Sequence, residues 1–321
     1  MSVLRTESIR FKSSDGVHQV AGYFFEDEAP RAILQISHGM CEYIGRYRDF
    51  AAFMALHGFA VCGNDHLGHG ATSPDPETDG WFANKGGRYY VLRDLKSMNT
   101  LARKRWPGLP LILLGHSMGS FFARWFAEVY PDALDALIIS GTGGPNPAAG
   151  MGLALTQAVG ALRGPKYRSK LVHDMAFGAY LKRVEAPETP YDWISRDKQI
   201  VSAYANDPKC TFRFTVSAFH ELMATLNEVS RPAWAEQIRT DLPVYLFSGD
   251  ADPVGDYGKG VQTVYDRLKA AGVADLRLKL YPGGRHEMLN ETNRAEVYED
   301  VLAWCEAHLP AEKEPASEQD Q

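Results

Sequence analysis

The pentapeptide Gly115-His116-Ser117-Met118-Gly119 lies between an apolar run at residues 111–114 and a helix-like run at residues 120–126. This order predicts a strand, a sharp turn and a helix. In such a turn the serine hydroxyl is exposed at the tip, and a small glycine on either side lets strand and helix pack closely. We therefore interpret the pentapeptide as a nucleophile elbow, with Ser117 as the nucleophile.

A serine hydroxyl is a weak nucleophile, and it needs a base to accept its proton and a carboxylate to orient that base. Two aspartates, Asp250 and Asp252, come directly after a buried-strand pattern at residues 243–248. His286 follows an alternating strand pattern at residues 276–281. The order serine, aspartate, histidine is that of α/β-hydrolases, and open α/β sheets place their sites at the carboxyl ends of strands. We therefore expect His286 to be the base, with one of the two aspartates beside it.

Further motifs occur in a fixed order along the chain: residues 38–42 (HGMCE) with 45–47 (GRY), residues 65–70 (DHLGHG), residues 249–254 (GDADPV) and residues 284–287 (GRHE). Together with the pentapeptide, they resemble the motifs of α/β-hydrolases of the monoacylglycerol lipase and lysophospholipase family, within the serine aminopeptidase-like hydrolases. The resemblance covers nearly all of residues 1–310. One departure is Tyr43, where this family commonly has histidine, and it concerns substrate detail rather than the catalytic machinery.

The resemblance implies roles for individual residues. Asp252 matches the Gly-x-x-Asp-x-Val pattern of the family and is expected to meet the histidine, whereas Asp250 is expected to cap the turn backbone. The tetrahedral oxyanion of ester hydrolysis needs two backbone donors. One is the N–H of Met118, the residue after the nucleophile, and the resemblance implies the N–H of Met40 as the other. These two amides form the expected oxyanion hole.

The remaining polar residues of the motifs have structural interpretations. His38 and Glu42 are expected to shape the oxyanion loop rather than to carry protons. Glu42 stands four residues before Arg46, a spacing at which an ion pair would steady the start of a helix. The acidic and histidine residues at 65–70 could suggest metal ligands, but a metal site needs further convergent ligands that the sequence does not offer, so we expect a structural turn.

Strands and helices alternate along most of the chain, which predicts a mainly parallel sheet of the α/β-hydrolase fold with helices on its flanks. The expected core consists of residues 1–143 and 240–310. A helical cap is expected at residues 144–239, and a disordered tail at residues 311–321, which are too polar to bury. The eight strand-like runs are residues 9–12, 20–25, 32–37, 60–63, 111–114, 137–140, 244–248 and 276–281.

The cap region contains helix patterns at residues 151–162, 171–181 and 215–229 and is rich in aromatic residues. A cap of this kind covers the nucleophile, excludes water and lines an apolar channel that suits an acyl chain. We expect substrate-binding roles for Phe177, Tyr180 and Trp193. The alternative is that these aromatic residues pack the small core of the cap itself.

The composition limits the classes of partner. Hydrophobic residues make up 45% of the chain and charged residues 23%, and the net charge of −6 implies no field that would attract nucleic acid. The amino terminus lacks the apolar core of a signal peptide, and no run approaches the length of a membrane span. Four cysteines lie far apart without metal or redox spacing, so reduced thiols in the cytosol are expected.

These observations predict a serine hydrolase that cleaves carboxylic esters with a lipid-like acyl group, such as a monoacylglycerol or a lysophospholipid. His286 accepts the proton of Ser117, Asp252 fixes the imidazole, and water releases the acid from the acyl-enzyme. Because His286 must be neutral, activity is expected to decline as pH falls through about 6 to 7. We expect a small ester as the partner, transient membrane contact through the cap, and no metal or other cofactor.

Three other functions remain open at this point. A short-chain or aryl carboxylesterase would share the triad but have a narrow acyl pocket. An aminopeptidase would need a carboxylate of the cap to hold the substrate ammonium, and Glu185, Glu188 and Glu221 are available. A catalytically silent binding protein is the third alternative.

Overall fold

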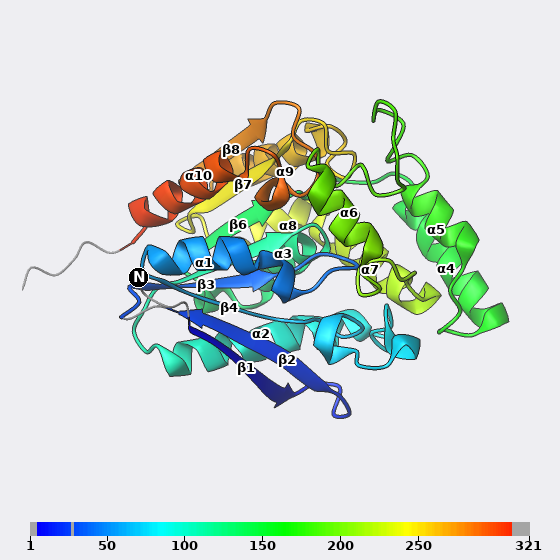
Figure 1. Cartoon of the computed structure of the whole chain (residues 1–321), viewed down its shortest axis with the longest axis horizontal. Coiled ribbons are helices and arrows are strands. Elements are labelled where there is room, and N and C mark those ends of the chain that lie inside the picture. The colour runs from blue at the N-terminus through cyan, green and yellow to red at the C-terminus, as the bar shows by residue number, and fades with distance from the viewer. Residues whose placement is uncertain (1–4, 27–28, 310–321) are drawn as a thin grey trace, which may run out of the picture.

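An eight-stranded sheet forms the centre of the molecule, with strand order β1-β2-β4-β3-β5-β6-β7-β8 (Figure 1). The structure is a computed structural model, and it describes residues 5–26 and 29–309. The tail expected at residues 311–321 lies outside the described residues. All eight predicted strands are present, and most extend a little beyond the predicted bounds. The strands are β1 (Arg5–Lys12), β2 (Gln19–Glu26), β3 (Ala32–Ser37), β4 (Phe59–Asn64), β5 (Leu111–His116), β6 (Ala136–Ser140), β7 (Val244–Gly249) and β8 (Leu276–Tyr281).

The sheet is parallel from β4 to β8, and β2 pairs antiparallel with both β1 and β4. The central strands are apolar along their whole length because both of their faces are covered. In β5, Leu111 and Leu113 pack into one hydrophobic cluster, and Ile112 and Leu114 pack into the cluster on the opposite face. The α/β-hydrolase fold expected from the sequence is therefore confirmed.

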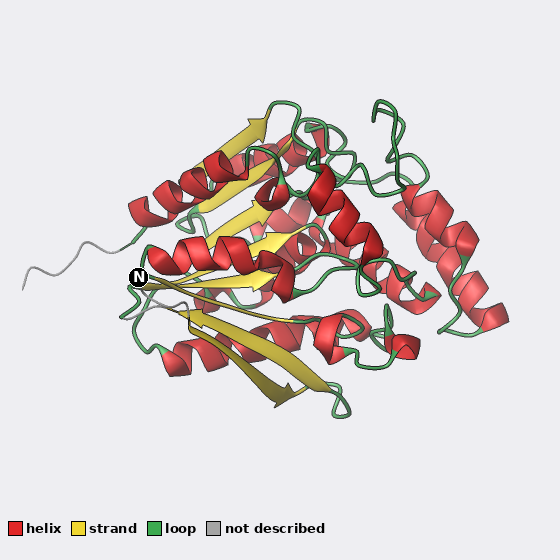
Figure 2. Ribbon diagram, viewed as in Figure 1, coloured by secondary structure: helices red, strands yellow, loops and turns green. Residues whose placement is uncertain are grey.

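Helices cover the sheet on both sides (Figure 2). The cluster on one face includes residues of α1 (Arg48–Leu56) and α10 (Arg294–Ala307). The opposite cluster includes residues of α2 (Gly87–Arg105), α3 (Met118–Val129) and α9 (Lys259–Ala270). Short 3-10 turns lie at Ile44–Tyr47, Gly70–Thr72, Pro76–Thr78, Pro131–Ala133 and Met288–Asn290.

A long insertion separates β6 from β7. All of residues 144–239 are described, and they contain no strand. The parallel strands point toward this insertion, which therefore lies beyond their carboxyl ends (Figure 1). Its helices are α4 (Ala149–Arg163), α5 (Lys170–Phe177), α6 (Lys198–Asn206), α7 (Val216–Val229) and α8 (Pro232–Glu236).

One buried side chain holds both ends of the insertion. Arg124, in α3, donates to the carbonyl oxygen of Gly143 at 3.0 Å and to the carbonyl oxygen of Val229. Its guanidinium also lies 4.4 Å from the ring centroid of Trp234. The helix that follows the pentapeptide is thus attached to the segments that enter and leave the insertion.

None of the helices in the described part of the chain is both long and apolar enough to cross a membrane.

Candidate active site

Ser117 occupies the turn between β5 and α3 and has a strained backbone, with φ of +51° and ψ of −120°. Such a conformation costs about 1–3 kcal/mol for a residue other than glycine, and it persists only where the surroundings enforce it. The two flanking glycines permit the close approach. A Cβ atom on Gly115 would lie 2.4 Å from the carbonyl oxygen of Gly119, and one on Gly119 would lie 2.0 Å from that of Ser37. The turn therefore presents Ser117 beyond the end of β5.

Asp252 and His286 form a buried pair beyond β7 and β8. The Nδ1 atom of His286 lies 3.0 Å from Oδ2 of Asp252, and the two residues are 3% and 0% exposed. Asp252 also accepts hydrogen bonds from Ser248 Oγ at 3.0 Å and from the amide of Val254 at 2.9 Å. Burial alone would lower the pKa of His286, but the charge and the hydrogen bond of Asp252, with the charges of Glu287 and Glu42, together raise this pKa above its usual value.

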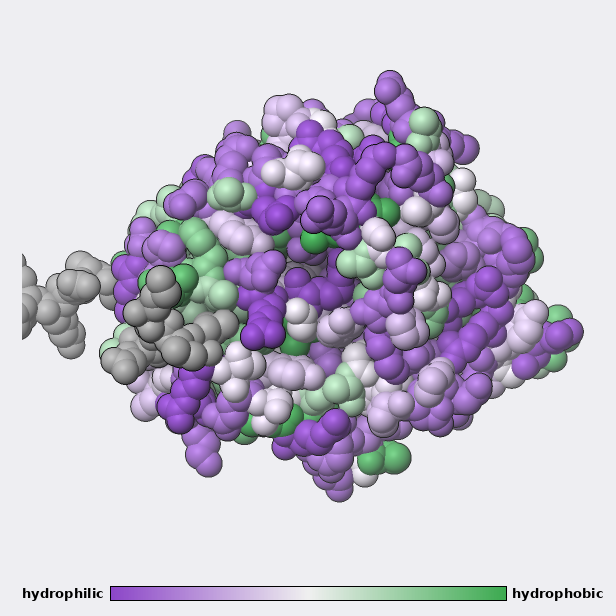
Figure 3. Space-filling model, in the orientation of Figure 1, coloured by the Kyte–Doolittle hydropathy of each residue, from purple (hydrophilic) through white to green (hydrophobic). Residues whose placement is uncertain are grey.

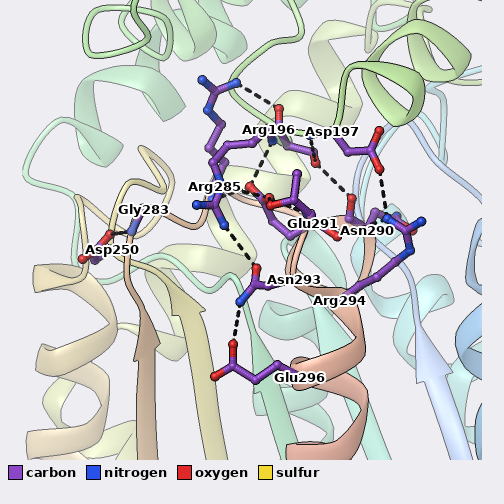
Figure 4. A network of polar contacts seen from close by, with 12 residues as sticks. Arg196, Asp197, Asp250, Gly283, Arg285, Asn290, Glu291, Asn293, Arg294 and Glu296 are labelled. Atoms are coloured by element: carbon purple, nitrogen blue, oxygen red, sulfur yellow. Dashed lines mark hydrogen bonds and ion pairs between the residues drawn. The ribbon is translucent and has the colours of Figure 1, made fainter.

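Asp250, the other candidate aspartate, makes no hydrogen bond to the histidine among the described residues. Its carboxylate accepts a hydrogen bond from the amide of Gly283 at 2.6 Å. The contact joins the loop after β7 to the loop after β8 (Figure 4). Asp250 therefore has the backbone-capping position that the sequence suggested, and Asp252 is the aspartate that meets His286.

Ser117 and His286 line the same cavity, but no hydrogen bond joins them among the described residues. The ring of His116, the last residue of β5, packs against that of His286, with the two centroids 4.7 Å apart. Met40 and Met118 also line this cavity, so the two residues expected to form the oxyanion hole lie beside the serine. Their amides make no hydrogen bond to another described residue, so both are available to a ligand.

The loop before Met40 is fixed by a buried carboxylate. Glu42 accepts hydrogen bonds from the amide of Gly39 and from the hydroxyl of Tyr47, the latter at 2.8 Å. Arg46 forms the ion pair with Glu42 expected from their spacing, at 3.0 Å, and donates two further hydrogen bonds to Glu287. Burial raises the pKa of Glu42. At Glu287 burial acts in the same direction, but the charge and hydrogen bonds of Arg46 together with those of its other neighbours lower the pKa.

The histidines of the early motifs are buried and act as scaffolding. His38 bonds the carbonyl of Gly39 through Nδ1 at 2.8 Å and accepts from the amide of His66 through Nε2 at 2.9 Å. Burial lowers the pKa of His66 to about 3 and that of His69 to about 4. Asp65 accepts from two backbone amides, those of Ile44 and Ala71. These residues therefore stabilise a turn by hydrogen bonds to neighbouring groups.

The cavity measures about 960 Å³ and extends from the serine into the insertion. Phe177, Tyr180 and Trp193 all line it. Trp193 has its ring centroid 5.1 Å from that of His286, and the ring of Tyr180 packs against Trp193 at 4.8 Å. These aromatic side chains thus form a continuous wall that begins at the histidine.

Several apolar cavity residues were not among those expected from the sequence to bind substrate. Phe121 contributes from α3, and α7 contributes a stripe at the spacing of one helix face. The stripe predicted a buried face, but it could not show that this face borders a cavity instead of solid core. The stripe residues that line the cavity are Phe219, Leu222, Met223 and Leu226.

Comparison with known proteins agrees with the fold and the site. The family model described as "Serine aminopeptidase, S33" matches residues 28–293. A monoacylglycerol lipase of Mycolicibacterium smegmatis is 28% identical over 93% of this chain and 96% of its own length. The human monoglyceride lipase is 26% identical over 91% of this chain and 88% of its own. A carboxyl esterase of Bacillus coagulans, solved in complex with glycerol, superimposes with a TM-score of 0.89 at 30% identity and covers 96% of this chain and 100% of that one.

Proposed function

The chain belongs to the serine aminopeptidase, S33 family, and from this membership and the site we propose that it hydrolyses carboxylic esters of lipid-like substrates such as monoacylglycerols or lysophospholipids. The observation that carries the proposal is the large cavity that joins Ser117 and His286 to the apolar faces of the insertion. Apolar cavities that bury most of a ligand are typical of small-molecule sites. Similar proteins of this length are monoacylglycerol and monoglyceride lipases, which supports an acyl glycerol as the substrate.

In the proposed mechanism, Ser117 attacks the ester carbonyl while His286 accepts its proton. The buried carboxylate of Asp252 holds the imidazole through Nδ1 and stabilises the imidazolium that forms. His286 then protonates the departing alcohol. Water, activated by the same imidazole, attacks the acyl-serine ester and releases the fatty acid and the free serine.

The amides of Met40 and Met118 would donate to the oxyanion in both steps. Each such donor contributes about 2.7–4 kcal/mol to stabilisation of the transition state. The amide of Gly39 already donates to Glu42, so it is not available for this purpose. This arrangement supports Met40, rather than its neighbour, as the donor of the early loop.

A narrower carboxylesterase is the second candidate, because the similar structure from Bacillus coagulans is a carboxyl esterase. That structure was solved with glycerol, the alcohol that a monoacylglycerol releases. An aminopeptidase is less well supported. Glu185 and Glu188 are exposed, Glu221 accepts from the amide of Gly86, and none of the three lines the cavity.

The insertion offers a surface for transient contact with lipid. Met151 of α4 and Met175 of α5 line the cavity and are also 68% and 61% exposed. Leu162 and Leu171, at the far end of the same two helices, are exposed as well. Hydrophobic residues stand among hydrophilic ones at this end of the molecule (Figure 3). A lipid surface that covered these residues would lie directly at the cavity.

We propose the cytosol as the site of action on separate grounds. The four cysteines are free and buried, and none forms a disulfide. Thiols of this kind are typical of proteins that work in a reducing compartment.

The experiment that tests the function is hydrolysis of a substrate panel, with monoacylglycerols and lysophospholipids of several chain lengths beside short aryl esters. Ser117→Ala should abolish turnover and covalent labelling by a fluorophosphonate, whereas the exposed Ser202→Ala should behave like the wild type. Turnover confined to acetyl and butyryl esters would favour the narrower esterase. Labelling that persists in Ser117→Ala would show that another residue is the nucleophile.

A further inference from the structure

Residues 192–197 of the insertion lie against the loop that carries His286, and polar contacts join the two segments (Figure 4). The amide of Glu287 donates to the carbonyl oxygen of Ile194 at 2.7 Å. Ser195 Oγ donates to the carbonyl oxygen of Asn290 at 2.9 Å. The insertion is therefore attached directly to the chain that follows the histidine.

Glu291 lies at the centre of these contacts and is fully buried. Its Oε1 atom accepts from the amides of Arg196 and Arg285, each at 3.0 Å. Its Oε2 atom accepts from Nε of Arg196 at 3.0 Å and from the amide of Thr292 at 2.8 Å. One carboxylate thus bonds the insertion, the residue before His286 and its own chain neighbour.

Arg285 makes the reverse connection. Its Nη1 atom donates to the carbonyl oxygens of Asp192 and Ser195, at 2.5 and 2.9 Å. Trp193, which lies between the two acceptors in the sequence, packs its ring against His286. The histidine is therefore preceded by a residue whose backbone amide is bound by Glu291 and whose side chain is bound by the insertion.

The arrangement determines where the imidazole can lie. A buried carboxylate needs hydrogen bonds to all of its lone pairs, and Glu291 finds them only when Arg285 and Arg196 are both in place. The amide of Arg285 is one peptide unit from the Cα of His286. Loss of this bond would let the loop shift, and displacements near 1 Å cost about a hundredfold in rate at a catalytic site.

We propose that Glu291 is a positioning residue for His286, and that it acts by clamping residues 192–197 of the insertion to the histidine loop. This inference rests on the proposed role of His286 as the general base. It makes the insertion part of the structure that holds the base, in addition to its contribution to the wall of the cavity.

The test compares Glu291→Gln with Glu299→Gln, the same substitution at an exposed position of α10. Glutamine places an amino group where one carboxylate oxygen accepts at least two hydrogen bonds, so at least two of these bonds are lost in either orientation. With p-nitrophenyl butyrate, Glu291→Gln should lower kcat/KM by about tenfold to a hundredfold, mostly through kcat. Glu299→Gln should match the wild type.

The pH profile separates positioning from a purely structural role. The acidic limb of kcat/KM should move to lower pH in Glu291→Gln, because a displaced imidazolium loses part of its bond to Asp252. A lowered melting temperature with unchanged kcat/KM and an unchanged limb would overturn the inference.

A second variant covers the case in which Glu291→Gln does not fold. Arg285→Met removes the bonds to the carbonyls of Asp192 and Ser195 and leaves Glu291 intact. Like Glu291→Gln, it should lower kcat/KM and move the acidic limb of the pH profile to lower pH. Wild-type behaviour of Arg285→Met in both readouts would contradict the proposal. A wild-type protein that neither cleaves esters nor reacts with a fluorophosphonate would instead overturn the proposed function, and this inference with it.

Discussion

Arg46 donates Nη1 and Nη2 to the two carboxylate oxygens of Glu287, each at 2.7 Å. Arg46 belongs to the turn after the oxyanion loop, and Glu287 directly follows His286. The same guanidinium pairs with Glu42, which holds the amide of Gly39. One arginine therefore couples the position of the proposed oxyanion donor to that of the proposed base.

Substitution of Arg46 by lysine should lower both activity and stability. Lysine keeps the charge but cannot make the paired bonds to Glu287, and loss of a hydrogen bond to a charged group typically costs about 1.5–3 kcal/mol. We expect a clear decrease in melting temperature and a fall of about tenfold or more in kcat/KM. Arg48→Lys, at an exposed position just outside the cluster, is the matched control. Equal melting temperatures for the two variants would contradict the coupling.

The pH dependence should follow the His286 and Asp252 pair. Burial lowers the pKa of His286, but Asp252 and the nearby charges of Glu287 and Glu42 together raise it above its usual value. The base must be neutral to act. As the pH is lowered, kcat/KM should therefore already be falling before pH 6.5 is reached, and it should continue to fall below that pH. A profile that is flat down to pH 5, with chemistry limiting the rate, would exclude His286 as the base.

Asp252→Asn should move this limb to lower pH, because the negative charge that stabilises the imidazolium is gone. It should also lower kcat by up to about ten thousandfold, as in serine hydrolases whose aspartate is replaced. Asp250→Asn retains a carbonyl acceptor for the amide of Gly283, so the limb should stay in place. The pH at which kcat/KM falls, measured for both variants, therefore distinguishes the roles of the two aspartates.

The chain-length preference should depend on α7. Leu226 lines the cavity, and tryptophan at this position would fill space available to an acyl chain. Each buried methylene group contributes about 0.8 kcal/mol. If several methylene groups of the acyl chain no longer fit, kcat/KM for dodecanoyl esters should fall at least about tenfold. Butyryl esters should be little affected. Leu56→Trp, on the exposed side of α1, is the control, and an equal effect on both chain lengths would contradict the assignment.

Contact with lipid should depend on the exposed ends of α4 and α5. Leu162→Ser with Leu171→Ser should reduce cosedimentation with phosphatidylcholine vesicles, while hydrolysis of a dispersed short ester stays the same. Val17→Ser with Val129→Ser, at exposed positions outside α4 and α5, should leave sedimentation unchanged. Equal sedimentation of both double variants would exclude this surface as the contact.

The strands and the order of the motifs could be predicted from the sequence for physical reasons. A strand covered on both faces must be apolar throughout, as in β5, and the run ends where the polar pentapeptide begins. The predicted helix at residues 171–181 is shorter in the structure, where α5 ends at Phe177 before Gly178. Helix α6 was not predicted from the sequence, although Asp197 caps its first turn through the amides of Gln199 and Ile200.

The parts of the site that depend on contacts between distant segments could not be predicted. Glu42 and Arg46 are four residues apart, so their pairing follows from helix geometry, but the link from Arg46 to Glu287 spans most of the chain. The clamp at Glu291 likewise joins residues that no local pattern relates. Tyr43, noted only as a departure from a family pattern, donates to Asp207 at 2.8 Å and so ties the oxyanion loop to the insertion.

The attachment of the insertion through Arg124 has a consequence for recombination between relatives. The arginine recognises two main-chain carbonyls, those of Gly143 and Val229, so any foreign segment with a similar backbone at these points could be accepted at its ends. The middle of the insertion is different, because Ser195, Arg196 and Asp197 bond the core through their own side chains. A chimera that exchanged the whole insertion would be expected to fold yet work poorly, and grafting only α4 and α5 would be the better route to a new chain-length preference.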